Sequence, residues 1–251
     1  MAQQSSIEWT DLTWNPVVGC SIESAGCKNC YAMRMAARLQ SMGHEKYEGL
    51  TERSKRGAVW TGKVRCHEDS IEIPLIWKKP RRVFVNSMSD LFHPDVPIDV
   101  VRRIWDVMGR TPQHHYQILT KRPTRMAELL QLISPEPLAN VWLGTSVEDH
   151  RVADRIDHLR KVPASVRFIS FEPLIGDVGR VDLTGIDWAI VGGESGPRAR
   201  YMDKEWVESI LEQCLESGTA FFFKQWGGVN KKKTGRLLRG RTYDEMPEYI
   251  S

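Results

Sequence analysis

Long apolar runs are missing from this sequence. The longest apolar runs, such as residues 220–223, are short. None approaches the roughly 20 residues that a helix needs to cross a bilayer. The first residues also lack the basic segment and apolar stretch of a secretory signal. We therefore expect a cytoplasmic protein with no membrane partner.

The chain has neither an even set of cysteines nor a strong excess of charge. Three of its five cysteines fall within eleven residues, and an odd, clustered set argues against a disulfide framework. A net charge of +3 is too mild to indicate nucleic-acid binding by itself. With 251 residues, the chain is long enough to bury a large core, and we expect a single domain over residues 1–251.

Short apolar segments recur along the chain and predict strands. They read as continuous apolar runs rather than strict alternations, which is typical of strands that are buried on both faces of a parallel sheet. The predicted strands cover residues 12–15, 82–88, 115–120, 140–145, 166–171, 187–192 and 220–224.

Helical patterns lie between most of these strands. They cover residues 31–41, 98–108, 123–133, 149–159 and 203–215, whereas the link 174–185 is too short and too rich in glycine for a long helix. Alternating strands and helices predict a parallel α/β fold with right-handed crossovers. Seven strands fit a complete or partial parallel (β/α) barrel, or an open doubly wound sheet. Residues 43–80 interrupt the alternation and are interpreted as an insertion after the first helix, and residues 227–251 as a basic C-terminal arm.

Polar side chains gather where the predicted strands end. In barrels, the carboxyl ends of the strands form the rim on which active sites are built. The alternative is that loops are generally polar, but six strand ends each carry a charged or amide group. Gly192 and Gly193 lack a Cβ and allow a ligand close to the backbone. The rim residues are Ser87, Ser89, Asp90, Lys121, Glu148, Glu172, Glu194 and Lys224.

Cys20, Cys27 and Cys30 have the spacing C-x6-C-x2-C. Thiolates are soft ligands that select zinc, copper(I) or iron–sulfur clusters. Three thiolates on one loop leave one coordination position open, which favours an iron–sulfur cluster with a reactive iron.

Two alternatives remain for these cysteines. Zinc could be held by the three thiolates with His44, His67 or Cys66 as the fourth ligand. The cysteines could also be small buried residues without a metal. Cys214 lies on an apolar helix face and is expected in the core.

The residues around the cysteines resemble a known loop. NPVVGC (15–20) and GCKNCYA (26–32) look like the cluster loop of radical S-adenosylmethionine proteins of the spore photoproduct lyase-like group, in which the first gap is usually shorter. From Trp14 to Pro247 the chain also resembles an uncharacterised three-cysteine family of phages, prophages and bacteria. The matching blocks are FVNSMSDLFH (84–93), QILTKRP (117–123), WLGTSVED (142–149), FEPL (171–174), VGGESG (191–196) and FFKQWG (222–227).

The resemblance implies a radical enzyme. Cys20, Cys27 and Cys30 would hold a [4Fe-4S] cluster whose open iron binds S-adenosylmethionine. An electron donor would then allow formation of a 5′-deoxyadenosyl radical, which abstracts hydrogen from a nucleic acid or nucleotide substrate. The resemblance suggests Ser87, Ser89, Asp90 and Glu148 as cofactor-binding residues, and Lys121, Glu172, Glu194 and Lys224 as catalytic residues. Gly192 and Gly193 are added as cofactor-binding residues only because they allow a ligand close to the backbone.

Two other functions compete with this one. The chain could be a non-enzymatic phage protein that carries an iron–sulfur cluster or zinc and binds DNA or a host component. It could also be an ordinary barrel enzyme that uses Lys121, Glu172 and Glu194 in acid–base catalysis.

Overall fold

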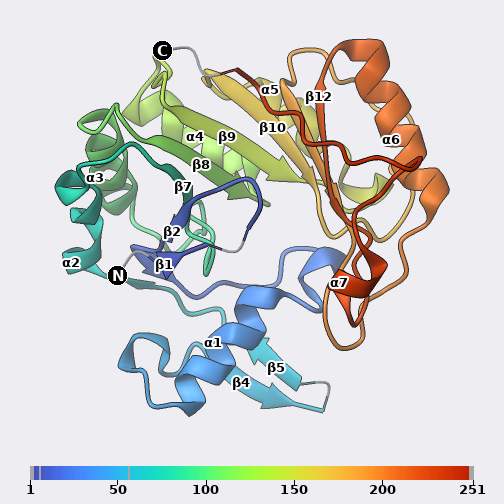
Figure 1. The fold of residues 1–251 in the computed structure, drawn as a ribbon. Coiled ribbons are helices and arrows are strands. Elements are labelled where there is room, and N and C mark those ends of the chain that lie inside the picture. The colour runs from blue at the N-terminus through green and yellow to red at the C-terminus, as the bar shows by residue number, and fades with distance from the viewer. Residues whose placement is uncertain (1–2, 6, 56, 249–251) are drawn as a thin grey trace.

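The computed structural model describes residues 3–5, 7–55 and 57–248 (Figure 1). Its centre is an eight-stranded sheet in the order β1-β2-β7-β8-β9-β10-β11-β12. In this sheet, β2 and β7 to β12 run parallel, and β1 pairs antiparallel at the edge. The sheet curls into a half-barrel, which confirms the predicted parallel α/β fold. The strands are β1 (Gln3–Gln4), β2 (Leu12–Trp14), β7 (Arg82–Val85), β8 (His115–Thr120), β9 (Val141–Ser146), β10 (Val166–Phe171), β11 (Trp188–Gly192) and β12 (Ala220–Gln225).

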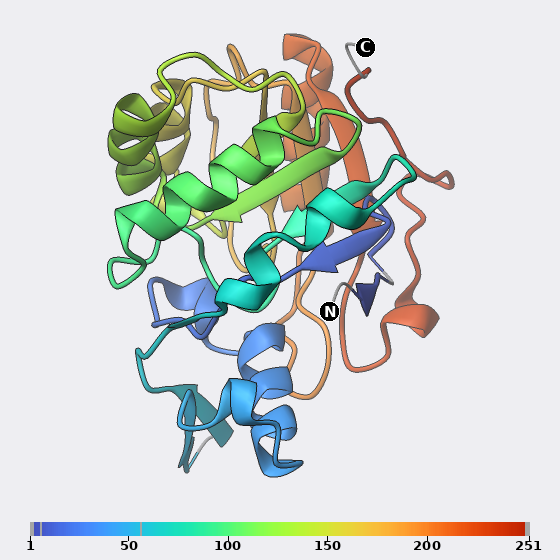
Figure 2. The same ribbon diagram turned by 90° about the vertical axis from the view of Figure 1, so that its left-hand side faces the viewer.

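Helices cover the convex face of the sheet (Figures 1 and 2). The predicted helix 149–159 is divided, because the Asp149 side chain accepts a hydrogen bond from the Arg151 amide and closes a separate 3-10 turn, His150–Val152. None of the described helices is long and apolar enough to span a membrane. The covering helices are α3 (Ile98–Gly109), α4 (Pro123–Ile133), α5 (Arg155–Arg160) and α6 (Lys204–Ser217).

Aromatic side chains fill the concave face of the half-barrel. Side chains alternate across a strand, so every second residue of the sheet points inward. Trp142, Phe168, Trp188 and Phe222 come from four successive strands, β9 to β12, and Trp9 joins them from the N-terminal segment. The Trp188 ring lies 5.8 Å from the Trp142 ring and 6.1 Å from the Trp9 ring, in edge-on contacts. This apolar cluster fills the interior, and the charged groups of the site lie at the carboxyl ends of the strands.

The expected insertion contains short elements that pack beside the first helix. Helix α1 (Tyr31–Ser41) contacts the antiparallel hairpin of β4 (Thr51–Ser54) and β5 (Gly57–Trp60), at the bottom of Figure 1. Val18, Met33, Leu50, Trp60 and Met88 are buried between them in a separate small core. Further along, β6 (Arg65–Cys66) pairs with β3 (Val17–Val18), and it is followed by α2 (Glu68–Ile71).

The C-terminal arm returns along β12 after the short helix α7 (Lys231–Thr234). The Phe223 amide donates to the Tyr243 carbonyl oxygen over 2.9 Å, and Trp188 Nε1 donates to the Glu245 carbonyl oxygen over 2.9 Å. Leu238 and Tyr243 are buried in the main core. The arm therefore closes the free edge of β12.

Replacing Trp188 with alanine should lower the free energy of unfolding by about 3–5 kcal/mol, because the aromatic cluster loses its central ring and keeps a cavity. Urea denaturation followed by circular dichroism measures this change. The control is Leu132→Ala, at a side chain that is 73% exposed, for which we expect less than about 0.5 kcal/mol. Equal effects of the two substitutions would contradict the packing described here.

Candidate functional site

The three cysteines lie on the loop between β3 and α1. Cys27 ends a 3-10 turn, Ala25–Cys27, and Cys30 directly precedes α1 at its N-cap position. The Gly19 amide donates to the Met88 carbonyl oxygen over 3.1 Å, which joins the start of the loop to the segment after β7. The loop therefore lies at the carboxyl end of the sheet, as predicted from the sequence.

Burial and mutual repulsion disfavour ionisation of two of the thiols, those of Cys20 and Cys30. Burial, the Asp90 carboxylate and the two other cysteines raise the pKa of Cys20 to about 12, against an opposing effect of Arg122. Burial and Cys27 raise the pKa of Cys30, against Lys121. The three sulfur atoms are thus within electrostatic reach of one another and of two cations. A metal centre deprotonates its thiol ligands, and the nearby cations would offset the negative charge that results.

The donor set fits an iron–sulfur cluster. In the part of the chain that the structure describes, no group of three or more His, Cys, Asp or Glu side chains is arranged to hold a single metal ion. The ligands of a four-iron cluster bind different iron atoms, so they need not converge on one point. Cys214 lies on α6 and is buried in the core, as expected. Cys66 lies in β6, where it is the strand partner of Val17 in β3.

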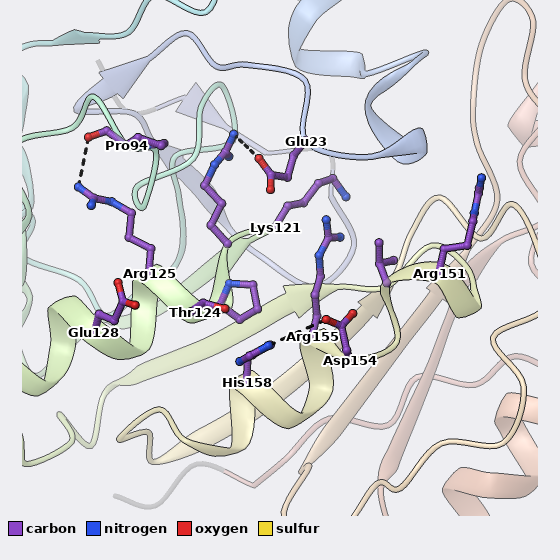
Figure 3. A pocket seen from close by; sticks show the side chains of 13 residues that line it. Glu23, Pro94, Lys121, Thr124, Arg125, Glu128, Arg151, Asp154, Arg155 and His158 are labelled. Atoms are coloured by element: carbon purple, nitrogen blue, oxygen red, sulfur yellow. Dashed lines mark hydrogen bonds and ion pairs between the residues drawn. The ribbon is translucent and has the colours of Figure 1, made fainter.

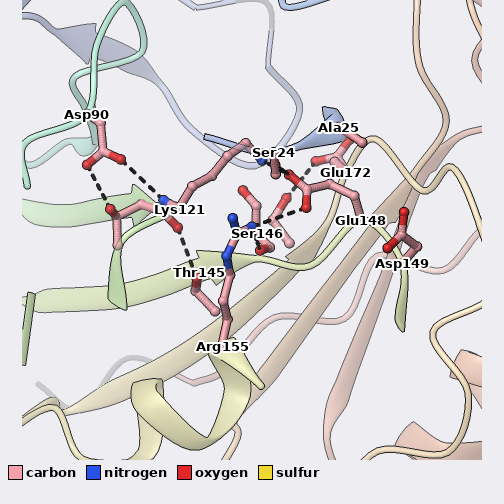
Figure 4. A network of polar contacts seen from close by, with 12 residues as sticks. Ser24, Ala25, Asp90, Lys121, Thr145, Ser146, Glu148, Asp149, Arg155 and Glu172 are labelled. Atoms are coloured by element: carbon pink, nitrogen blue, oxygen red, sulfur yellow. Dashed lines mark hydrogen bonds and ion pairs between the residues drawn. The ribbon is translucent and has the colours of Figure 1, made fainter. Parts of the chain in front are cut away.

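Glu148 is the most deeply buried acid of the site, at 1% exposed (Figure 4). Its carboxylate forms an ion pair with Lys121, accepts from Arg155 Nη1 over 3.1 Å and from Ser24 Oγ over 2.7 Å. Burial alone would raise the pKa of Glu148, but Lys121, Ser24 and Arg155 outweigh it, and the pKa lies below its ordinary value. Gly26 packs directly on this side chain, since a Cβ there would lie 2.7 Å from Glu148 Cδ. Glu148 therefore ties the cysteine loop to β9 and α5.

Glu194 holds the other side of the same loop. It accepts from Asn29 Nδ2 over 2.8 Å and from Arg200 Nη2 over 2.6 Å. Arg200 Nη1 also donates to the Ala25 carbonyl oxygen over 2.9 Å. Burial opposes ionisation of Glu194, but Arg200 and Asn29 outweigh it and lower its pKa.

Ser87, Ser89 and Asp90 anchor the segment after β7. Ser87 Oγ donates to Asn15 Oδ1 over 3.2 Å, and Ser89 Oγ donates to the Val17 carbonyl oxygen over 2.9 Å. Asp90 accepts from Thr120 Oγ1 over 2.7 Å and from Arg122 Nη1 over 2.8 Å. All three side chains thus bind the protein's own loops, and their assignment to a cofactor stays a prediction.

Glu172 and Lys224 form another ion pair of the rim, at the ends of β10 and β12. Lys224 Nζ lies 3.1 Å from Glu172 Oε1, and the two side chains are 17% and 16% exposed. Unlike Glu148 and Glu194, Glu172 has no hydrogen bond to the cysteine loop among the described residues. The catalytic role expected for this pair therefore stays a prediction.

Gly192 and Gly193 pack against protein groups. A Cβ at Gly192 would lie 3.2 Å from Glu172 Cδ, and one at Gly193 would lie 2.8 Å from the Trp226 carbonyl carbon. These neighbours leave no room for a Cβ, which already explains why both positions are glycine. That the two glycines allow a ligand close to the backbone stays a prediction.

A family model described as "Protein of unknown function (DUF5131)" matches residues 4–247. The chain belongs to this family. No protein of curated function matches the sequence. Solved structures share the fold: two variants of spore photoproduct lyase each align with a TM-score of 0.53 and 12% identity, over 88% of this chain and 78% of theirs. A further variant, with bound AdoMet and dinucleoside spore photoproduct, aligns with a TM-score of 0.48 and 12% identity, over 86% and 64%.

Three residues of the site in this DUF5131 protein were not anticipated from the sequence. They are Ser24, Asn29 and Arg155, which contact Glu148 or Glu194. Ser24 and Asn29 lie within the cysteine segment, which is the one signal that could have singled them out.

Replacing Glu148 with glutamine should lower the free energy of unfolding at pH 7 by about 3 kcal/mol, because Lys121 and Arg155 lose a buried counter-ion. Folding lowers the pKa of Glu148, so its contribution is complete above the ordinary value of 4.5 and is lost as the pH falls through the folded-state pKa. The difference between variant and wild type should therefore shrink below pH 4.5, as measured by urea denaturation.

Glu216→Gln is the matched control, because Glu216 pairs with Arg180 at the surface. We expect it to change the free energy of unfolding by less than about 1 kcal/mol at any pH. A pH-independent loss in Glu148→Gln would show that the carboxylate charge is not what stabilises the loop.

Proposed function

We propose that this protein is a radical S-adenosylmethionine enzyme that modifies or repairs a nucleic acid or nucleotide. The observation that carries the proposal is the cysteine loop. Three neighbouring thiols are held by Glu148 and Glu194 at the carboxyl end of a parallel half-barrel. The fold is similar to that of spore photoproduct lyase, which supports the same reaction class here.

Cys20, Cys27 and Cys30 would hold a [4Fe-4S] cluster in this proposal. When bound, the cluster and S-adenosylmethionine supply the 5′-deoxyadenosyl radical that abstracts hydrogen from the substrate. Lys121 and Arg122 partly oppose the effect of burial, which raises the pKa of Cys30 and Cys20, and the same cations would balance the thiolate charge. An external electron donor is part of the proposal.

Glu172 and Lys224 would contact the substrate. They lie at the carboxyl ends of β10 and β12, and their ion pair is partly exposed to solvent. A lysine and a carboxylate at one place can bind a phosphate or hydroxyl group and move a proton to or from it. Glu148 and Glu194 act as positioning residues, because both hold the cysteine loop.

Anaerobic reconstitution with iron and sulfide should give about four iron atoms per chain and 5′-deoxyadenosine after addition of dithionite and S-adenosylmethionine. Serine substitution of Cys20, Cys27 or Cys30 should abolish both. Cys66→Ser and Cys214→Ser are the matched controls and should keep both. Stoichiometric zinc without iron in protein purified without oxygen would favour the non-enzymatic alternative.

Replacing Arg200 with glutamine should make the reconstituted protein lose iron several-fold faster to a chelator, because Glu194 and the Ala25 carbonyl lose a shared donor. The visible absorbance of the cluster follows this loss. Arg180→Gln, at an exposed arginine paired with Glu216, is the control and should lose iron at the wild-type rate. Equal rates of iron loss in both variants would show that Arg200 does not stabilise the cysteine loop.

A further inference from the structure

His93 is buried beside the start of the cysteine loop, and the proposed function does not yet use it. Its side chain lies in the turn that follows the segment after β7, and the residue is 3% exposed. The His93 amide donates to the Asp90 carbonyl oxygen over 3.1 Å, and the Val96 amide donates to the His93 carbonyl oxygen over 3.0 Å. The ring Nε2 lies 2.9 Å from Ser21 Oγ, and Ser21 directly follows Cys20 in the chain. The ring therefore connects this turn to the first cysteine of the loop.

The hydrogen bonds of the His93 ring determine which nitrogen carries the proton. The Asp95 amide donates to Nδ1 over 3.2 Å, so Nδ1 is an acceptor without a proton. In a neutral imidazole the other nitrogen is then the donor, and Nε2–H donates to Ser21 Oγ. Burial and Arg122 outweigh the nearby acids and lower the pKa of His93, so the ring is neutral at pH 7. His93 is therefore a fixed hydrogen-bond donor to Ser21.

The Ser21 hydroxyl accepts a second hydrogen bond, from Arg122 Nη2 over 2.9 Å. Two donors thus share one oxygen and use both of its lone pairs. The same guanidinium donates from Nη1 to Asp90 Oδ2 over 2.8 Å, and its Nη2 forms an ion pair with Glu23 over 2.9 Å. It also lines a hollow of about 540 Å³ beside the cysteine loop, where Glu23 and its ion pair are drawn (Figure 3). Among these partners, Ser21 is the one next to Cys20 in the chain.

The position of the Arg122 charge matters for Cys20. Asp90 raises the pKa of Cys20 and Arg122 lowers it, so both charges are within electrostatic reach of this sulfur. Coulomb energies fall with distance, so the balance at the sulfur depends on where the guanidinium is held. Without the Ser21 hydroxyl, Arg122 would keep its two acids, but it would lose the contact to the residue beside Cys20.

We propose that His93 is a positioning residue: through Ser21 it holds the Arg122 guanidinium beside Cys20, and this charge raises the reduction potential of the bound cluster. Reduction adds a negative charge to a cluster, and a fixed cation stabilises that charge. The potentials of iron–sulfur clusters depend on net charge and on hydrogen bonding around their sulfur atoms. The redox role rests on the proposed function, whereas the contact between His93 and Ser21 does not.

Two substitutions at His93 separate its two hydrogen bonds. Asparagine can place its amide oxygen near Nδ1 and keep the acceptor for the Asp95 amide, but it is too short to reach Ser21. Glutamine can place its amide nitrogen near Nε2 and keep the donor to Ser21. Ser21→Ala removes the shared acceptor and leaves the ring in place, so it replaces His93→Asn if that variant does not fold. His158→Asn is the control, at a partly exposed histidine that lies 3.9 Å from Asp154.

Hydrogen exchange of the cluster-free full chain, followed by mass spectrometry, tests the contact to Ser21. Amide exchange in residues 20–23 should be several-fold faster in His93→Asn and in Ser21→Ala, because the start of the loop loses its attachment. His93→Gln and His158→Asn should exchange at the wild-type rate.

A redox titration of the reconstituted protein, followed by electron paramagnetic resonance, tests the redox role. At a fixed applied potential, the ratio of reduced to oxidised cluster should fall roughly threefold to tenfold in His93→Asn and Ser21→Ala. His93→Gln and His158→Asn should keep the wild-type ratio. A residue that only supported the fold would loosen the loop without changing this ratio.

Three outcomes would overturn the proposal. The first is wild-type exchange in both His93→Asn and Ser21→Ala, and the second is equal effects of His93→Asn and His93→Gln. The third is faster exchange with an unchanged ratio of reduced to oxidised cluster, which would make His93 a structural residue only. A wild-type protein that binds no iron would refute the proposed function together with the redox role, whereas an iron-loaded protein with an unchanged ratio would refute the role of His93 alone.

Discussion

The buried carboxylate of Glu148 is the interaction on which the site depends. It joins Lys121 at the end of β8, Arg155 at the start of α5 and Ser24 of the cysteine loop. A charge at 1% exposure is tolerated only because these partners replace the water that burial removes. Lys121 and Arg155 also line the hollow beside the loop.

The arrangement recurs along the rim. A glutamate follows each of three successive strands: Glu148 follows β9, Glu172 follows β10 and Glu194 follows β11. Each glutamate forms an ion pair with a different basic side chain. Glu148 and Glu194 hold the cysteine loop from two sides, while Glu172 pairs with Lys224. The three glutamates are chemically identical, and their neighbours determine which of them contact the loop.

The sheet could be predicted from the sequence because its strands are buried on both faces. The apolar runs gave β7 to β12 to within a few residues, and the rim followed from where they ended. The partners of Glu148 and Glu194 could not be predicted, because Ser24 and Asn29 lie 124 and 165 residues away from them in the chain. Gly192 illustrates the same limit: the sequence indicated room for a ligand, and the fold places the Glu172 side chain there.

The central claim is that three thiols hold a cluster with one iron open to S-adenosylmethionine. The most direct measurement is the low-temperature electron paramagnetic resonance spectrum of the reduced, reconstituted protein, recorded before and after addition of S-adenosylmethionine. The account predicts the signal of a reduced four-iron cluster and a change in that signal on addition, because the ligand binds the open iron. A cluster signal that S-adenosylmethionine leaves unchanged, or the absence of a cluster signal, would contradict it.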